Sequence, residues 1–126
     1  MANTTAYGVN SSGDICGLQN EPSIYAIAWP DGANSSADYQ TLAVPTGFAP
    51  SHTTAISSNS TIIGYAYNGS AVHALRWTKS GSSWPWSSAQ DLNAPAGGQA
   101  FAYAIADDGS VAGKGNVHYW RTVPCL

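Results

Sequence analysis

The chain has 126 residues, of which 44% are hydrophobic and 9% charged, and its net charge is −3 at pH 7. An average soluble protein carries about 25% charged residues. With four basic side chains, the chain lacks the means to neutralise a run of phosphates, so we expect no direct nucleic-acid binding. No apolar run approaches the roughly 20 residues that cross a bilayer, so we expect no membrane insertion.

One phrase returns three times along the sequence: a small or aliphatic pair, a turn, and an aliphatic strand that ends in glycine. The copies occupy residues 8–17, 55–64 and 104–113. Their closing glycines are 47 and 49 residues apart, at Gly17, Gly64 and Gly113. A tryptophan-bearing segment follows each copy, at residues 25–29, 73–77 and 116–120. Self-similarity at this period is typical of a repeated β unit such as a propeller blade.

The repeats predict a single all-β domain over residues 1–126, with repeat 1 at 5–53, repeat 2 at 54–101 and a partial repeat 3 at 102–126. Each complete repeat of about 48 residues has room for four short antiparallel strands, which is the spacing of propeller-like blades. The predicted strands are 6–9, 14–17, 25–29, 38–44, 53–57, 61–67, 73–77, 90–93, 101–106, 110–113 and 116–120. Type I′ hairpin turns, with positive φ at both central positions, are expected at Ser12-Gly13, Asn59-Ser60 and Asp108-Gly109.

Small and large residues alternate in the tryptophan-bearing strands, as in Tyr25, Ile27 and Trp29 against Ala26 and Ala28. One face of such a strand carries bulk and the other carries alanine, which lets neighbouring sheets pack closely. We therefore expect the repeated tryptophans in the core between blades, with a ligand platform as the alternative: Trp29, Trp77 and Trp120.

The repeated phrase resembles the HAF repeat, a family of extracellular repeats in bacterial proteins, with the pattern A-x-x-I-N-x-x-G-x-I-x-G, then A-x-x-W-x-x-G, then D-L. Matching residues in repeats 1 and 2 are Val9-Asn10, Gly13, Ile15, Gly17, Ala26, Trp29, Gly32, Ile56, Ile63, Gly64, Ala74, Trp77, Gly81 and Asp91-Leu92. The third copy matches through Ile105, Asp108-Gly109, Val111, Gly113 and Trp120. Departures are Ser57 and Ala106 in place of asparagine and Ser60 in place of glycine. The resemblance implies a propeller-like architecture outside the cell, and it brings no catalytic residues.

The number of repeats predicts self-association. Closed propellers have four to eight blades, whereas this chain supplies about two and a half. A lone piece would expose sheet edges that invite pairing, so we expect a homo-oligomer that completes a ring. In one version of that ring, residues 2–9 of a neighbouring subunit finish repeat 3. A β-trefoil is the alternative architecture, although the third repeat is only half the size of the others.

A candidate binding site lies in repeat 2, where Trp84-Pro85-Trp86 falls in the predicted loop after the third strand. Loops mostly lie on the surface, and exposed aromatic faces suit sugar rings and protein interfaces. Tyr65, Tyr67 and Asn68, on the adjoining strand, would add hydrogen bonds to either kind of partner. Three interpretations stay open here: carbohydrate contact, contact with a subunit or partner, and packing within the chain.

The residues that carry catalysis or bind metals show no suitable spacing, so we expect neither an enzyme nor a cofactor. The adjacent carboxylates Asp107 and Asp108 fall in a predicted turn, and three histidines show no metal-ligand pattern, His52, His73 and His118. The two cysteines, Cys16 and Cys125, are either buried free thiols or a disulfide that ties the last strand to repeat 1.

The first functional hypothesis is a non-catalytic extracellular module that recognises carbohydrate like a lectin, with repeated sites that add avidity. The alternative is a structural surface protein, such as a virion decoration protein or a subunit of an extracellular assembly. Either role places the chain outside the cell or on a particle surface. The first residues lack the basic region and apolar core of a signal peptide, so we expect a mature chain or another export route.

Overall fold

The computed structural model describes residues 3–20, 23–33, 38–79, 86–92, 99–115 and 119–122, the last range by its backbone alone. Across these ranges the regular structure consists of antiparallel β-strands, and no helix is present. The prediction of an all-β antiparallel fold is therefore confirmed. None of the described segments forms a helix long and apolar enough to cross a membrane.

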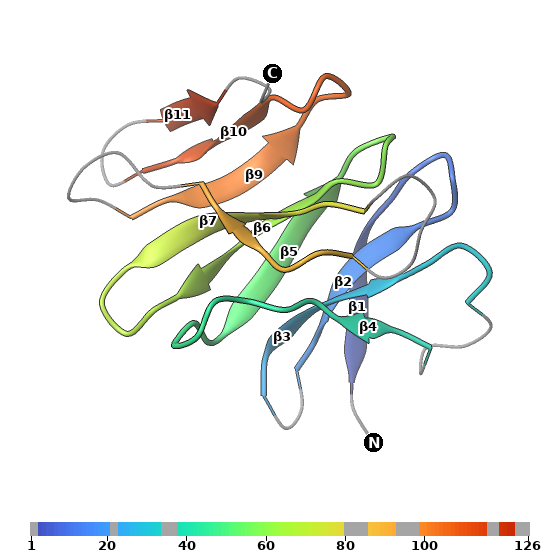
Figure 1. Cartoon of the computed structure of the whole chain (residues 1–126), viewed down its shortest axis with the longest axis horizontal. Helices are drawn as coiled ribbons and strands as arrows, with labels where there is room; N and C mark the ends of the chain where they lie inside the picture. The colour runs from blue at the N-terminus through green and yellow to red at the C-terminus, as the bar shows by residue number, and fades with distance from the viewer. Residues whose placement is uncertain are drawn as a thin grey trace.

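Three separate sheets follow one another along the chain (Figure 1), and in each of them strands that are neighbours in sequence pair with each other. Sheet 1 contains β1 (Thr4–Val9), β2 (Ile15–Gln19), β3 (Tyr25–Trp29) and β4 (Gln40–Thr41). Sheet 2 contains β5 (Ser51–Ile56), β6 (Ile62–Tyr67), β7 (Val72–Trp77) and β8 (Gln90–Asp91). Sheet 3 contains β9 (Phe101–Ile105), β10 (Val111–Lys114) and β11 (Tyr119–Thr122). Sheet 2 begins at Ser51, so the boundary expected after residue 53 falls inside β5.

The sheets are arranged in chain order, with sheet 2 between sheet 1 and sheet 3 (Figure 1). The first strands lie side by side, β1 next to β5 and β5 next to β9. Among the described strands, none pairs with a strand of another sheet, so the closed barrel of a β-trefoil is not formed. In the single chain, β1 pairs with β2, so residues Thr4–Val9 belong to sheet 1. That a neighbouring subunit's first strand finishes the third sheet stays a prediction.

The first hairpin of each sheet has the same turn, and it is not the expected type I′. In sheet 1 the N–H of Gly13 donates to the carbonyl of Asn10, and the N–H of Asn10 donates to the carbonyl of Asp14. The second and third sheets repeat these two bonds with Ser57, Ser60 and Thr61, and with Ala106, Gly109 and Ser110. Each turn has a single residue with positive φ, at Gly13 (88°), Ser60 (66°) and Gly109 (90°). This is the three-residue loop whose last residue forms a G1 bulge.

Gly17 and Gly64 are required because a neighbouring backbone lies against them. A Cβ atom at Gly17 would lie 2.1 Å from the carbonyl oxygen of Thr5, and one at Gly64 would lie 1.8 Å from that of His52. Opposite each closing glycine the first strand carries a β-bulge, which leaves one extra residue out of the ladder. The extra residues are Tyr7, Thr54 and Tyr103.

The core fills the two interfaces between the sheets, which we call seam 1–2 and seam 2–3. In seam 1–2 the small residues Cys16, Ala26 and Ala28 belong to one cluster with Ile62, Leu75 and Trp77. In seam 2–3 the residues are Ile63 and Ala74 with Ala102 and Val111. The alternation of small and large residues therefore places a small face of sheet 1 against a bulky face of sheet 2.

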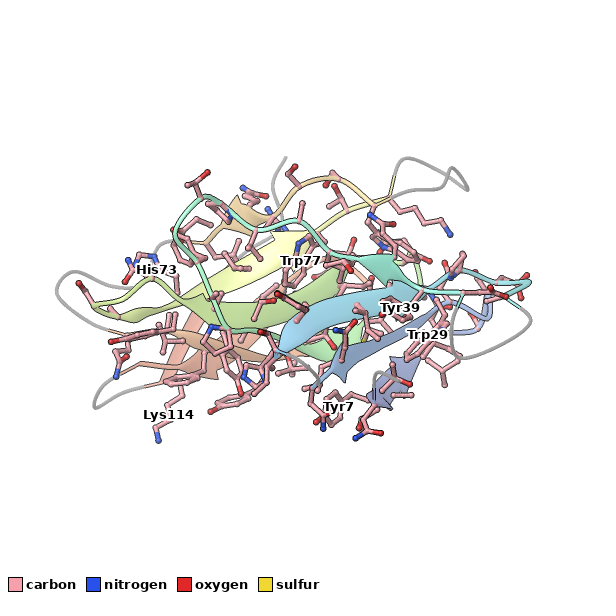
Figure 2. The ribbon with its side chains drawn as sticks, turned by 90° about the horizontal axis from the view of Figure 1, so that it is seen from below. Tyr7, Trp29, Tyr39, His73, Trp77 and Lys114 are labelled. Carbon is pink, nitrogen blue, oxygen red and sulfur yellow. The ribbon has the colours of Figure 1, made fainter. Side chains whose placement is uncertain are left out.

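The repeated tryptophans occupy buried positions where the structure describes their side chains. Trp77 is fully buried, and its indole N–H donates to the carbonyl oxygen of Ala43 at 2.8 Å. Trp29 is also buried, with its ring edge-on to Tyr39. In Figure 2, Trp77 lies among the ribbons in the middle of the molecule, whereas Tyr7 and Lys114 project from its lower side. The backbone of Trp120 belongs to β11, and its side chain lies outside the described residues.

Candidate functional site

Of the predicted binding loop Trp84-Pro85-Trp86, the structure describes Trp86. Trp84 lies outside the described residues. Trp86 is only 3% exposed and belongs to the core cluster of seam 1–2. Its indole N–H donates to the carbonyl oxygen of Ser60 at 2.8 Å, and the ammonium group of Lys79 lies 4.8 Å from its ring centroid. Of the three interpretations left open for this loop, packing within the chain describes Trp86, because the indole has both an apolar environment and an internal hydrogen-bond acceptor.

The structure also separates the other predicted ligand residues from Trp86. Trp86 contacts Ser60, ahead of the start of β6, whereas Tyr67 ends that strand. Six extended residues span on the order of 17–20 Å. Asn68 closes the turn after β6, since its side-chain oxygen accepts the N–H groups of Ser70 and Ala71 at 2.9 and 2.8 Å. These residues do not form one site.

Tyr65, from the same prediction, belongs to a different group of aromatic rings. It stacks on His52 with 4.9 Å between ring centroids, and it meets the ring of Phe101 edge-on at 4.9 Å. Phe101 in turn stacks with Tyr103 at 6.1 Å. The rings come from β5, β6 and β9, so this group joins sheet 2 to sheet 3.

These rings border an open pocket of about 390 Å³ that we call the aromatic pocket, lined by Tyr7, His52, Thr53, Thr54, Tyr65 and Tyr103. The first strand of every sheet contributes to it, through Tyr7 on β1, His52 on β5 and Tyr103 on β9. Tyr7 and Tyr103 are 53% and 51% exposed. Both are the extra residues of their β-bulges, which explains why large aromatic rings on regular strands point away from the core.

The aromatic pocket is uncharged near neutral pH. Burial raises the pKa of Tyr65, and the neighbouring hydroxyl groups of Tyr103 and Tyr7 raise it further. Burial lowers the pKa of His52, which favours its neutral imidazole. The pocket therefore offers phenol and imidazole groups as neutral donors and acceptors beside exposed aromatic faces.

Two threonines at the floor of the pocket hold the sheets together. The hydroxyl of Thr53 donates to the carbonyl of Gly17 in sheet 1 at 2.8 Å. The hydroxyl of Thr54 donates to the carbonyl of Ala102 in sheet 3 at 2.7 Å. Because each bond crosses a seam, the relative positions of Tyr7, Tyr65 and Tyr103 are set by the same contacts that join the sheets.

A larger pocket, of about 840 Å³, lies between the first hairpin turns of sheets 1 and 2, and its lining includes charged side chains. Asp14, a buried lining residue, accepts hydrogen bonds from the hydroxyl of Ser60, from the ammonium of Lys79 at 2.8 Å and from the N–H of Asp31 at 2.7 Å. Asn10 donates to the hydroxyl oxygen of Ser60 and to the carbonyl of Ser57, both at 2.9 Å. We call Asn10, Asp14, Ser60 and Lys79 the polar clasp.

The polar clasp is an internal link between sheets. Burial raises the pKa of Asp14, but the hydrogen bonds from Lys79, Ser60 and Asp31 and the charge of Lys79 outweigh that effect, so the pKa is below its ordinary value. The carboxylate is thus ionised and already has donors from its own chain. This arrangement stabilises seam 1–2, whereas the aromatic pocket presents its rings to solvent.

The adjacent carboxylates considered in the sequence analysis lie in a turn. Asp107 and Asp108 lie in the β9–β10 turn, where the carboxylate of Asp108 accepts the N–H of Ser110 at 2.8 Å. Over the described ranges, no group of three or more His, Cys, Asp or Glu side chains is placed to hold a metal ion.

Cys16 has a free thiol that is fully buried, and burial raises its pKa to about 11. Its proposed partner, Cys125, lies outside the described residues. The disulfide between them stays a prediction.

The sequence contained a signal for the aromatic pocket that the predictions did not use. Tyr7, Thr54 and Tyr103 each directly precede a copy of the repeated phrase. If inward and outward residues are assumed to alternate strictly along the strand, this position is assigned to the wrong face, because a β-bulge shifts the alternation by one residue.

The chain matches no family model, no curated protein and no solved structure. The resemblance to the HAF repeat therefore stays a prediction that rests on its motif residues. Any function assigned to the chain has to be argued from the geometry of the described residues.

Proposed function

We propose that the protein is a non-catalytic extracellular module that binds carbohydrate in the aromatic pocket. The observation that carries the proposal is the pair of half-exposed rings, Tyr7 and Tyr103, on either side of a concave site. Sugar rings present C–H groups that pack on aromatic faces, and hydroxyl groups that need hydrogen-bond partners. The rings of Tyr7 and Tyr103 supply the faces, while Tyr65 and His52 supply neutral polar groups.

The size and electrostatics of the pocket fit a neutral ligand. Its volume of about 390 Å³ is within the usual range for small-molecule sites, about 300–1,000 Å³. A phosphorylated or strongly acidic ligand would need a cationic side chain, and none of the six lining residues carries one at neutral pH. The proposal thus names a neutral saccharide and places it at the first strands of the sheets.

The architecture we propose for this module is part of a β-propeller, with each sheet as a blade. Three consecutive antiparallel sheets whose first strands lie together support this interpretation. In a propeller the first strands surround a central channel, so the aromatic pocket would open into that channel. A location outside the cell or on a particle surface is part of the same proposal.

The test is a screen of the wild-type chain on a broad glycan array, followed by titration calorimetry with the sugar it retains. Tyr7→Ala and Tyr103→Ala should each weaken binding by about tenfold or more, corresponding to about 1.4 kcal/mol. Tyr67→Ala is the matched control, because Tyr67 is also exposed, at 41%, but does not line the pocket. It should bind like the wild type.

Two outcomes would contradict parts of this proposal. If the wild type retains no glycan, the carbohydrate function is wrong. If the wild type binds but both pocket variants bind equally well, the function stands and the site is elsewhere.

A second candidate function, a structural subunit of a virion surface or an extracellular assembly, is favoured by one observation. On the outward face of sheet 3, Ala104 and Ala112 are exposed, and no other sheet among the described residues covers them. Such a face is suited to association with another sheet.

A further inference from the structure

We propose that two copies of this chain associate head to tail, with sheet 3 of each copy packed on sheet 1 of the other, and so close a ring of six sheets. The inference comes from the two seams inside the chain, and it does not depend on the carbohydrate proposal. The two faces that meet are the outward face of sheet 3 in one copy and the outward face of sheet 1 in the other.

Each sheet presents an equivalent pair of residues toward the next sheet. The pair consists of a residue on the first strand and its ladder partner on the second strand. In chain order the pairs are Gly8 with Cys16, Ala55 with Ile63, and Ala104 with Ala112. In each pair the second-strand residue directly precedes the closing glycine of its repeat. The three pairs therefore lie on the same face of their sheets.

The first two pairs are covered by the sheet that follows. A Cβ atom at Gly8 would lie 3.4 Å from the side chain of Ile56 in sheet 2, and Cys16 is fully buried. Ile63 is also fully buried, in the cluster that contains Val111 of sheet 3. A seam therefore forms on this face of sheet 1 and again on this face of sheet 2.

Among the described residues, no other sheet covers the third pair. Ala104 and Ala112 are exposed, and together with Ala106, Asp108 and Ser110 they line an open hollow of about 470 Å³. Ile105 and Val111, which belong to seam 2–3, border the same hollow. We call this surface the alanine face.

The complementary surface is found at the other end of the molecule, on sheet 1. The residues that each following sheet brings into a seam are Ile56 and Ile62 in seam 1–2, and Ile105 and Val111 in seam 2–3. Their equivalents in sheet 1 are Val9 and Ile15. Val9 is 66% exposed, more than any other large apolar side chain among the described residues. Sheet 1 thus carries the bulky residues of a seam on its outward face, and no other sheet among the described residues packs on them.

The number of copies follows from ring closure. Sheets 1 and 3 lie at opposite ends of the chain (Figure 1), so one molecule cannot join its own two faces. Each chain contributes three sheets, and closed rings of such sheets have about four to eight members. Two copies give six sheets, whereas three copies exceed the range. A two-copy ring also covers both alanine faces and both Val9 surfaces.

The experiment is light scattering after size exclusion over a range of protein concentrations. The wild type should show twice the 13.0 kDa of a single chain. Ala112→Arg and Val9→Arg should each lose the dimer and show the mass of one chain, because either charge would be buried in the seam. The matched control is Ala43→Arg, at an exposed alanine outside both surfaces, and it should remain dimeric.

Mixing the two variants tests the head-to-tail arrangement. The Ala112→Arg chain keeps an intact Val9 surface, and the Val9→Arg chain keeps an intact alanine face, so the mixture should form a two-chain complex that neither variant forms alone. Val9→Arg changes an exposed side chain, so the monomer should keep the β-sheet circular dichroism spectrum of the wild type at room temperature, which separates loss of assembly from loss of folding.

Three results would overturn the inference. They are a wild type that is monomeric at every concentration, a dimer that persists in both variants, and an assembly larger than two chains.

Discussion

At the scale of single residues, Ser60 shows how one position serves both backbone geometry and the interface between sheets. Its φ of 66° is a conformation that costs a non-glycine residue about 1–2 kcal/mol. The equivalent positions in the other two turns are Gly13 and Gly109. A serine stands in this turn, where its hydroxyl group donates a hydrogen bond to Asp14 and accepts one from Asn10. Strain in the turn is thus offset by hydrogen bonds in the polar clasp.

We expect Ser60→Ala to be less stable than Ser60→Gly by about 1 kcal/mol. Both variants lose the hydroxyl group and its hydrogen bonds, but only the alanine variant keeps the left-handed strain. Urea unfolding of the two variants and the wild type measures the difference. Equal stability of the two variants would show that the strain at this position is negligible.

The polar clasp also makes stability depend on pH in a defined direction. The folded state lowers the pKa of Asp14, so the unfolded chain binds the proton more readily. The stabilisation is therefore fully present above the ordinary aspartate pKa of about 4, and it is lost as the pH falls through the folded value. Urea midpoints measured on both sides of that range should fall more steeply for the wild type than for Asp14→Asn. The same slope in both proteins would contradict the assignment.

Removal of the positively charged partner of Asp14 should lower the free energy of unfolding more than a change of pH does. Lys79→Met keeps an apolar stem beside Trp86 but leaves a carboxylate that is 2% exposed without its ammonium group. Breaking a buried pair in this way costs about 3–5 kcal/mol. Arg76→Met is the control, since Arg76 bonds only to Gln90 at the surface among the described contacts and should cost less than about 1 kcal/mol.

At the scale of strands and turns, the closing glycine and the bulge opposite it form one unit. The bulge moves the neighbouring backbone onto the glycine, so a Cβ atom would meet a carbonyl oxygen that cannot move without breaking the ladder. The bulged residues Tyr7 and Tyr103, in turn, expose their rings to solvent. This pairing explains why the glycine recurs in every repeat and why the aromatic pocket is built from residues next to it.

Gly64→Ala should destabilise the fold by about 3 kcal/mol or more, which is at the upper end for a single substitution. Gly32→Ala provides the comparison, because Gly32 has a positive φ, of 93°, which Gly64 does not have, and no atom lies within 4 Å of the added Cβ. That change should cost only about 1–2 kcal/mol of backbone strain. Thermal unfolding of both variants measures the difference, and equal losses would show that the close approach does not matter.

The strands were largely predictable because they follow from residue periodicity. The segment Tyr25–Trp29 was expected with the bounds that the structure gives it, since alternating alanine and large residues define two faces. The predicted turn type was wrong because Asn-Ser and Asp-Gly pairs fit several types of turn. Which type forms depends on the G1 bulge at the last residue of the loop. The burial of Trp86 was not predictable, since it depends on the carbonyl group of Ser60, which is distant in sequence.

At the scale of the whole molecule, the two seams differ in how they are held. Seam 1–2 has the polar clasp, the bond from Thr53 to Gly17 and the bond from Trp77 to Ala43. Across seam 2–3 the described side-chain bonds include the one from Thr54 to Ala102. The candidate site could not be predicted at this scale either, because it combines residues from all three repeats that only the stacking of sheets brings together.

The β-bulge has one more consequence, which concerns how such a chain can change over evolution. At Tyr7 and Tyr103 the bulge directs about half of the side chain to solvent. These two residues can therefore be exchanged for others at a smaller cost in folding than the glycines that face them. Recognition and stability are encoded at adjacent but separate positions, so duplicated repeats can acquire new ligand preferences one side chain at a time.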